Sequence, residues 1–290
     1  MAGIEVKQRR ILIVQDISGA GGCSALVALP VLSLAGLSCS LLPTAYLSTH
    51  TGGFGPVHRR DLSEDIQATL AHWERLELRF DAVYIGYAAS AAQLGMLEKA
   101  LPGLMEAGAK LYIDPVMGDH GRRYAFCGEE LIAGFKTLCA KADIIFPNLT
   151  EAALLLGLPL INGKDPAPPE PGKLRSIGGR SAVLTGIRDG QGGIGVRAEC
   201  ALEAPQTIFR PEYEGSYPGT GDLLASCVIA AVMLGASLPQ ACDIACDFLD
   251  EAFRRTVFIG SDPRSGLVFE PSLKRLAQAF KGIPAHEEHL

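Results

Sequence analysis

The fold is decided by one stretch, KLYIDPVMG (Lys110–Gly118), in which a short apolar run ends in an acidic turn. An apolar run of this length between turn residues is typical of a strand buried on both faces in a parallel sheet. Pro115 stops the strand because it has no N–H to donate to a neighbouring strand. Ligands of open parallel sheets bind beyond the carboxyl ends of the strands. Asp114 therefore stands where a ligand is expected, although an ordinary turn explains it equally well when it is taken alone.

Five more apolar runs of this kind occur along the chain. They are bounded by turn residues and cover Ile11–Val14, Cys39–Ala45, Ala82–Ile85, Ile144–Phe146 and Ser181–Thr185. Segments with helical spacing lie between them, at Ser24–Leu34, Ser63–Arg75, Ala91–Ala107 and Glu129–Lys141. Alternation of strand and helix predicts an α/β fold, with a mostly parallel central sheet and helices on both faces.

The pattern changes after Thr185. Glycine-rich, strand-like pieces come first and helices follow, at Gly190–Cys200, Gln206–Arg210, about Leu223–Gly235 and Leu238–Arg254. The strand-like pieces suit an antiparallel edge of the sheet. The Pro-rich stretch Asp165–Gly172 is typical of a surface loop rather than of a domain linker, so we expect residues 1–290 to form one domain. The polar residues 282–290 are expected to fray.

Composition excludes several classes of partner. A net charge of -6 without a basic stripe argues against nucleic acid or an anionic membrane as the main partner. No apolar run is long enough for a membrane span, and the polar start Met1–Arg10 is unlike a secretory signal. The eight cysteines contain no CxxC pair, so we expect buried free thiols and a reducing cytoplasmic location.

A second informative segment is PGTGD (Pro218–Asp222), which opens a helical run. Small residues at a helix start allow unpaired backbone N–H groups to converge on an anion, and the helix dipole favours negative charge there. Asp222 could also accept a proton from a substrate hydroxyl. For an isolated Gly-Asp pair, a simple cap of the helix is the better explanation.

Polar residues follow two other strands in the same way. NLTE (Asn148–Glu151) has the spacing of a capping box, and its oxygens could also bind Mg²⁺ through waters. The first turn, QDISGAGGCS (Gln15–Ser24), is unlike a dinucleotide fingerprint because Ser24 replaces the third glycine. A glycine-lined pocket floor with Asp16 and Ser18 as hydrogen-bonding groups fits better. The hydroxyl-rich loop Leu47–Gly55 could hold a polar aromatic ligand.

Together these motifs resemble pyridoxal kinases of the ribokinase-like superfamily, and most nearly the bacterial pyridoxamine kinase branch. The motifs, in order, are DISGAGGCS (Asp16–Ser24), STHTGGFG (Ser48–Gly55), GYAAS (Gly86–Ser90), DPVMGD (Asp114–Asp119), NLTE (Asn148–Glu151), LTG (Leu184–Gly186) and PGTGD (Pro218–Asp222). The resemblance covers roughly Ile11–Arg254. It implies a ribokinase-like three-layer sandwich, ATP with Mg²⁺ as phosphoryl donor, and transfer to the 5′-hydroxyl of pyridoxal, pyridoxamine or pyridoxine. It further implies a cytosolic homodimer, and leaves the need for a monovalent cation open.

The resemblance also implies roles for individual residues. Asp222 matches the catalytic base, and the backbone of Gly219, Thr220 and Gly221 matches the anion hole for the transferring phosphoryl group. Residues matching the ATP site are Asp114, Asn148, Glu151, Thr185 and Gly186, and those matching the Mg²⁺ site are Asp114 and Glu151. Residues matching substrate contacts are Thr51 and Tyr87, with Asp16 or Ser18 at the pyridine ring and Asp222 at the hydroxyl.

Two departures from the family pattern bear on specificity. Many pyridoxal kinases have Ser followed by His where this chain has Asp16-Ile17, and Lys where Thr185 stands. Lys164, Arg122 or Arg123 could replace that lysine from a loop. The segment Gly118–Tyr124 could close over ATP as a flap, or could carry only solvated charges.

Three alternative functions remain open. A hydroxymethylpyrimidine kinase shares the fold but typically has Cys where Asp222 stands. A sugar kinase is less favoured because no extra lid domain is evident. A non-catalytic vitamer-binding regulator would have no need of Asp222, Asp114 and Glu151.

Overall fold

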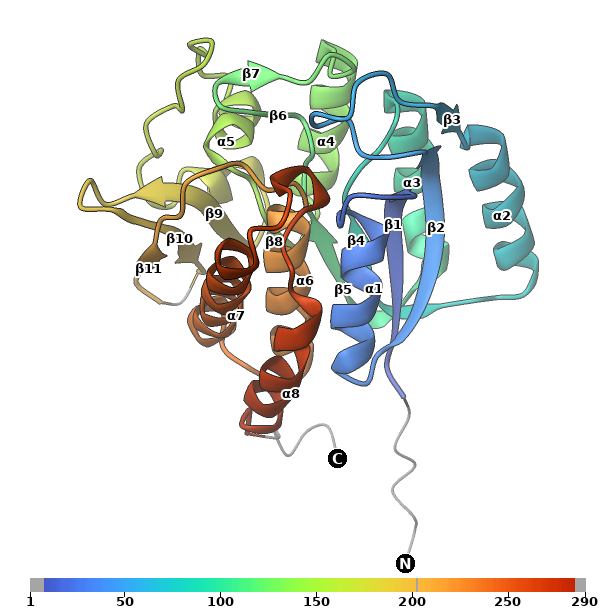
Figure 1. Ribbon diagram of the computed structural model, residues 1–290. Helices are drawn as coiled ribbons and strands as arrows, with labels where there is room; N and C mark the ends of the chain where they lie inside the picture. The colour runs from blue at the N-terminus through green and yellow to red at the C-terminus, as the bar shows by residue number, and fades with distance from the viewer. Residues whose placement is uncertain (1–7, 202, 285–290) are drawn as a thin grey trace, which may run out of the picture.

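A nine-stranded sheet forms the middle layer of the protein. The structure, a computed structural model, describes residues 8–201 and 203–284 (Figure 1). The strands are β1 (Arg10–Ser18), β2 (Ser38–Leu47), β3 (Arg59–Asp61), β4 (Phe80–Ile85), β5 (Met105–Ile113), β8 (Ile144–Ile145), β9 (Ser181–Arg188), β10 (Gly193–Glu199) and β11 (Gln206–Pro211). Their order is β11-β10-β9-β8-β5-β4-β1-β2-β3. The six strands from β9 to β2 are parallel, whereas β3 and the β10–β11 pair are antiparallel edges.

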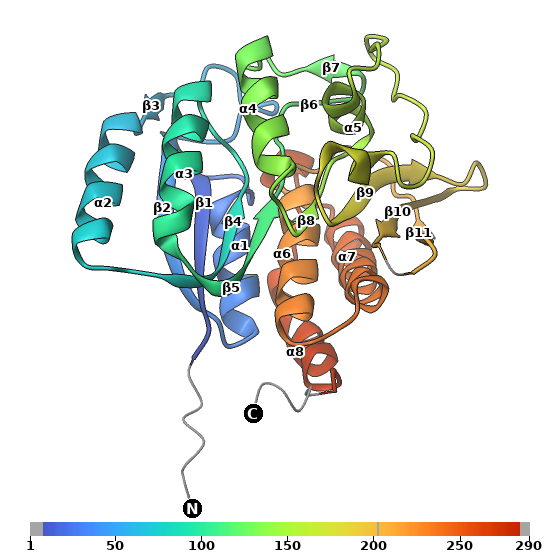
Figure 2. The ribbon, with the colours of Figure 1, turned by 180° about the vertical axis from the view of Figure 1, so that it is seen from behind.

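Helices cover both faces of this sheet, which confirms the predicted three-layer architecture (Figures 1 and 2). The helices on one face are α1 (Ala25–Leu34), α6 (Thr220–Met233), α7 (Leu238–Ile259) and α8 (Leu273–Lys281). The helices on the other are α2 (Ser63–Arg75), α3 (Ala91–Leu104), α4 (Glu129–Cys139) and α5 (Leu149–Leu156). Successive side chains of a strand point to opposite faces. In β1, accordingly, Ile11 and Ile13 pack in the first layer, and Leu12 and Val14 in the second.

Helix boundaries differ from the sequence-based prediction by three residues or more at three places, and the third is the end of α7, which lies at Ile259 rather than at Arg254. The helix expected over Ala91–Ala107 ends at Leu104, because Met105 adopts extended backbone (φ -100°, ψ 133°) and pairs with Phe80 in the sheet. The helix expected from Leu223 begins at Thr220 instead. This second difference matters for function, since it places Asp222 inside the first turn of α6.

The prediction that most cysteines are buried free thiols is confirmed where the structure describes the chain. All eight cysteines are unpaired; six are buried, and Cys39 and Cys200 are half-buried. Among residues 8–201 and 203–284, no helix combines the length and apolarity that a bilayer span requires. The expectation that residues 1–290 form a single domain stays a prediction. Of the tail expected to fray, residues 285–290 lie outside the described residues.

Candidate active site

The carboxyl ends of the parallel strands bring together polar residues that are far apart in the sequence. Asp16 lies near the end of β1, Tyr87 two residues beyond β4, and Asp114 directly after β5. The Asp114 N–H donates to the carbonyl of Ile85 at 2.8 Å, so the turn after β5 is held against the end of β4. The edge predicted to bind a ligand therefore carries the predicted acidic group.

The N-terminus of α6 approaches this edge through a turn that only glycine can form. Gly219 has φ +80°, and a Cβ there would lie 2.1 Å from the carbonyl oxygen of Gly22. The PGTGD segment thus packs directly on the backbone of the glycine-rich first turn. The Thr220 hydroxyl donates to the carbonyl of Tyr217 at 2.7 Å. The first N–H groups of α6 lack intrahelical acceptors and form the positive end of the helix dipole.

Asp222 is held at both of its carboxylate oxygens. Oδ1 accepts a hydrogen bond from Gln15 Nε2 at 3.0 Å, and Oδ2 accepts one from the backbone N–H of Ser24 at 2.9 Å. Removal from bulk water raises the pKa of Asp222 to about 6, with the charge of Asp16 adding to the shift and the two hydrogen bonds opposing it. A carboxylate with this pKa is suited to act as a general base near neutral pH.

Asp114 and Glu151 form a second, more deeply buried acidic pair. Burial raises the pKa of both carboxyl groups well above the ordinary range, and repulsion adds to it, from Asp222 on Asp114 and from Asp114 on Glu151. None of the ion pairs found among the described residues involves these two side chains. Uncompensated buried carboxylates are costly, and a hard divalent cation relieves that cost. The donor set therefore fits Mg²⁺.

The capping box predicted for Asn148 and Glu151 is confirmed. The Asn148 side chain accepts from the Glu151 N–H at 2.9 Å, and Glu151 Oε2 accepts from the Asn148 N–H at 2.9 Å. Glu151 Oε1 also accepts from the N–H of Met117, just past Asp114. Each carboxylate oxygen of Glu151 is thus oriented by a backbone donor, which leaves one lone pair on each for a metal-bound water.

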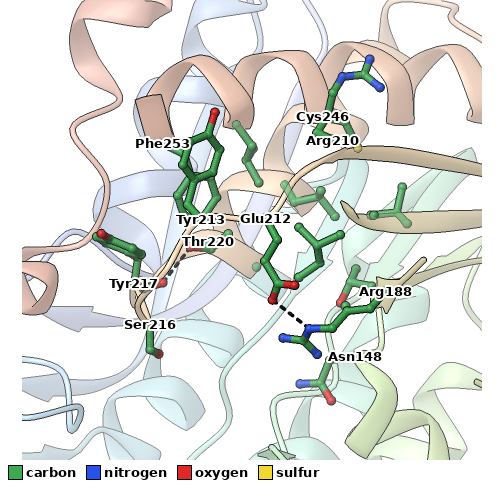
Figure 3. Close-up of a pocket in the computed structure, with 18 of the residues that line it drawn as sticks. Asn148, Arg188, Arg210, Glu212, Tyr213, Ser216, Tyr217, Thr220, Cys246 and Phe253 are labelled. Atoms are coloured by element: carbon green, nitrogen blue, oxygen red, sulfur yellow. Dashed lines mark hydrogen bonds and ion pairs between the residues drawn. The ribbon is translucent and has the colours of Figure 1, made fainter. Parts of the chain in front are cut away.

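A cavity of about 320 Å³ opens beside this acidic centre (Figure 3). Five of the residues predicted to bind ATP or the transferring phosphoryl group line it, namely Asn148, Thr185, Gly186, Thr220 and Gly221. Asp114, Glu151 and Asp222 are not part of the lining. The cavity therefore lies on the nucleotide side of the predicted site.

Sequence reasoning missed the two arginines that line this cavity, Arg188 and Arg210. Arg188 lines it and lies 2.8 Å from both Glu212 and Asp165, whereas Lys164, Arg122 and Arg123, the expected replacements, are absent from the lining (Figure 3). Asp119 and His120 of the hairpin formed by β6 (Gly118–Asp119) and β7 (Arg122–Arg123) also border the cavity. The predicted flap thus lies next to the nucleotide side. Asp119, His120 and Asp165 could hold a metal ion, but Asp165 is already paired with Arg188.

Aromatic residues form another part of the cavity wall that the sequence did not reveal. The rings of Tyr213 and Phe253 stack with centroids 5.3 Å apart and planes 5° apart, and Tyr217 meets Phe253 edge-on. Tyr213 also donates to Asp250 at 2.7 Å. These residues come from the loop after β11 and from α7, so no local pattern identifies them. Flat apolar surfaces of this kind suit a heteroaromatic base.

Three of the residues expected at the acceptor substrate, Asp16, Ser18 and Tyr87, lie at the carboxyl ends of β1 and β4. Ser18 donates to Asp16 Oδ2 at 2.8 Å, and burial raises the pKa of Asp16. Tyr87 packs edge-on against Phe126 at 5.2 Å. Thr51 is exposed on its loop, so the structure does not bring its side chain to this cluster. The substrate contacts stay predictions.

Two loops meet over the first turn through a histidine that was not singled out. Gly52 N–H donates to His50 Nδ1 at 2.9 Å, so Nε2 carries the proton and donates to the carbonyl of Arg264 at 2.6 Å. A Cβ on Gly21 would lie 2.3 Å from the His50 ring. His50 thereby fastens the loop around Thr51 to the 3₁₀ turn η2 (Pro263–Ser265) and to the first turn.

Comparison with known proteins finds relatives among the kinases that the sequence motifs resemble. The family model described as phosphomethylpyrimidine kinase matches residues 16–265. A thiamine biosynthetic bifunctional enzyme of Arabidopsis thaliana is 27% identical over 88% of this chain, which spans about half, 49%, of that enzyme. A pyridoxine/pyridoxal/pyridoxamine kinase of Bordetella avium is 30% identical, over 89% of this chain and 88% of that protein. A Bacteroides thetaiotaomicron structure named for phosphomethylpyrimidine kinase and determined with pyridoxal is 32% identical, with a TM-score of 0.87 over 93% and 96% of the two chains.

Proposed function

This chain belongs to the phosphomethylpyrimidine kinase family, within the ribokinase-like superfamily, and we propose that it phosphorylates the 5′-hydroxyl of a vitamin B6 vitamer with ATP and Mg²⁺. The family and the relatives make it a phosphotransferase of vitamin B6 or thiamine chemistry. The observation that carries the finer proposal is the placement of Asp222, a carboxylate with a pKa of about 6 in the first turn of α6. It directly follows Thr220 and Gly221, which line the cavity, and its pKa is affected by the charge of Asp16.

The site supplies the three elements that phosphoryl transfer requires. Asp222 accepts the proton of the attacking hydroxyl. The N–H groups at the start of α6, from Thr220 onward, stabilise negative charge on the moving phosphoryl group. Asp114 and Glu151 would hold Mg²⁺, which neutralises charge on the phosphate oxygens when bound. Because both Asp222 oxygens are already hydrogen-bonded, the base is oriented before substrate arrives.

The choice of acceptor is tested by offering four alcohols in parallel. Pyridoxal, pyridoxamine, pyridoxine and hydroxymethylpyrimidine are incubated with ATP and Mg²⁺, and the products are followed by chromatography. We expect efficient turnover of at least one B6 vitamer. Turnover of the pyrimidine alone would overturn the vitamer assignment, and ligand binding without any turnover would indicate a regulator.

A hydroxymethylpyrimidine kinase is the second candidate. The family description and the Arabidopsis relative favour it. Asp222 favours a B6 vitamer as the acceptor, since hydroxymethylpyrimidine kinases typically have Cys at this position. A homodimer, a cytoplasmic location and a role for a monovalent cation stay predictions.

Replacing Arg188 by Met should weaken nucleotide binding about 10-fold or more. The change removes one of the two arginines that line the cavity, and a hydrogen bond to a charged group contributes roughly 1.5–3 kcal/mol. ADP affinity measured by titration calorimetry checks this result. Arg180→Met is the matched control, because Arg180 is 77% exposed and does not line the cavity. Equal affinities for both variants would remove Arg188 from the nucleotide site.

A further inference from the structure

A buried glutamine connects the Asp222 carboxylate to the sheet. Gln15 is fully buried in β1 and makes three hydrogen bonds. Its Oε1 accepts from the Tyr87 N–H at 2.9 Å, while its Nε2 donates to Asp222 Oδ1 at 3.0 Å and to the Tyr84 hydroxyl at 3.3 Å. Tyr84 and Tyr87 lie at the end of β4, and Asp222 lies in the first turn of α6, so Gln15 joins the sheet to that helix.

The orientation of this amide is determined by its partners. The Tyr87 N–H can only donate, so the atom facing it must be the carbonyl oxygen. The NH₂ group is then directed to Asp222 and Tyr84, and each of its two hydrogens has one acceptor. A flipped amide would place its oxygen against the Asp222 carboxylate. The observed orientation is the one in which Gln15 serves Asp222 as a donor.

Tyr84 extends the connection to the second acidic group. Its hydroxyl accepts from Gln15, and its interaction with Asp114 lowers the pKa of that carboxyl group, against the larger effect of burial. Tyr84 is completely buried, and this burial raises its pKa well above the ordinary value, so the hydroxyl keeps its proton. Gln15 thus donates both to Asp222 and to a tyrosine that interacts with Asp114.

The backbone at Gly86 leaves room for the Gln15 amide only because this residue has no side chain. A Cβ on Gly86 would lie 2.1 Å from Gln15 Nε2 and 2.4 Å from its Cδ. Gly86 follows β4 directly, and its N–H is bonded to the carbonyl of Val14 at 2.9 Å, so the two strand ends are held together. The glycine therefore provides the space in which the Gln15 amide sits.

We propose that Gln15 is a positioning residue for phosphoryl transfer, which holds the Asp222 carboxylate in the orientation that receives the acceptor hydroxyl proton. The inference rests on the proposed function. Gln15 donates a hydrogen bond to Oδ1 of Asp222 and the Ser24 N–H donates one to Oδ2, so rotation of the carboxylate breaks at least one of these bonds. Without Gln15, Oδ1 loses the one side-chain donor that the described residues provide, and the carboxylate can turn toward other groups. Misorientation of a base lowers the rate of the chemical step rather than nucleotide binding.

Two substitutions of Gln15 separate this role from a purely structural one. Gln15→Met removes all three hydrogen bonds at similar volume, whereas Gln15→Glu keeps the acceptor for the Tyr87 N–H and removes both donors. We expect both variants to lower kcat roughly 10- to 100-fold with the KM for ATP changed less than two-fold. Recovery of kcat in Gln15→Glu would show that Gln15 only supports the backbone of Tyr87, and would overturn the proposal.

A matched control and a safer variant keep the outcome decisive. Gln93→Met removes another fully buried glutamine, which bonds Ala89 and Thr44 away from Asp222, and should leave kcat unchanged in the folded protein. Tyr84→Phe deletes only one hydroxyl and should lower kcat several-fold with ADP affinity unchanged, even if Gln15→Met fails to fold. Unchanged kcat in both Tyr84→Phe and Gln15→Glu would contradict the proposal.

The test remains informative if the vitamer assignment fails. Turnover is measured with whichever of the four alcohols the wild-type protein phosphorylates. Crystal structures of wild type and Gln15→Glu give a readout independent of activity, in which the Asp222 carboxylate is expected to leave the Ser24 N–H. Absence of all wild-type turnover would overturn the proposed function alone, whereas an unmoved carboxylate would overturn the role of Gln15.

Discussion

Asp222→Asn lowers kcat by about 10²–10⁴-fold, the range expected for loss of a general base, while ADP binding stays near its wild-type strength. The amide cannot accept the hydroxyl proton, yet it occupies nearly the same volume beside the cavity. Steady-state kinetics with the preferred alcohol and titration calorimetry with ADP measure the two effects. Asp65→Asn is the control, because Asp65 is an exposed carboxylate in the first turn of α2. Turnover within a few-fold of wild type would remove Asp222 from the chemistry.

The same substitution should change how stability depends on pH. The pKa of Asp222 is about 6 in the folded protein and 3.8 for the ordinary side chain. The folded state therefore binds more protons between these values, and the stability that the protonated group contributes is fully present below about pH 4 and is lost as the pH rises through 6. Asn does not titrate. Between pH 4 and pH 7, the melting temperature of Asp222→Asn should rise relative to that of the wild-type protein. A relative fall would contradict the raised pKa.

Gly219→Ala should reduce both activity and stability strongly. A Cβ at this position would lie 2.1 Å from the Gly22 oxygen and 2.9 Å from the Cys23 Cα, and the φ of +80° disfavours any side chain. Relief requires that α6 and the first turn separate, which displaces the N–H groups expected to stabilise the phosphoryl group. We expect kcat to fall at least about 100-fold and the free energy of unfolding to fall by about 2–4 kcal/mol, from strain plus overpacking. Urea denaturation and steady-state kinetics measure both effects.

Gly260→Ala is the matched control for this prediction. Gly260 ends α7 with φ +67°, but a Cβ there would meet nothing within 4 Å. Conformational strain alone should cost about 1 kcal/mol and leave turnover unchanged. If the two alanine variants lost equal stability and both kept full activity, the contact between Gly219 and Gly22 would have no functional importance.

Much of the fold could be predicted because apolar periodicity is local. The parallel strands at Ile11–Val14 and Leu111–Ile113 are buried on both faces, and such strands appear in the sequence as continuous apolar runs. The short strand β3 contains only Arg59, Arg60 and Asp61, all exposed, and no sequence pattern distinguishes it from a loop. It exists because the end of β2 offers an unpaired edge.

The candidate site was predicted in its motifs but not in its connections. PGTGD and NLTE each combine glycine or capping chemistry with an acid, so they are recognisable one by one. No local motif identifies Gln15, since its role depends on hydrogen bonds to Asp222, 207 positions later, and to Tyr84 in another strand. Arg188 and the Tyr213–Phe253 stack were missed for the same reason, because β9, the loop after β11 and α7 meet only in the folded chain.

The buried thiols give the protein an internal set of chemical probes. Alkylating reagents attack the thiolate, and burial raises the pKa of Cys139, Cys227 and Cys242. Cys139 packs on one face of the sheet, whereas Cys227 of α6 and Cys242 of α7 pack on the opposite face. Labelling of these sulfurs therefore requires opening of the structure around them. The order in which they become modified under mild denaturant reports which of the two outer layers detaches from the sheet first, without any introduced label.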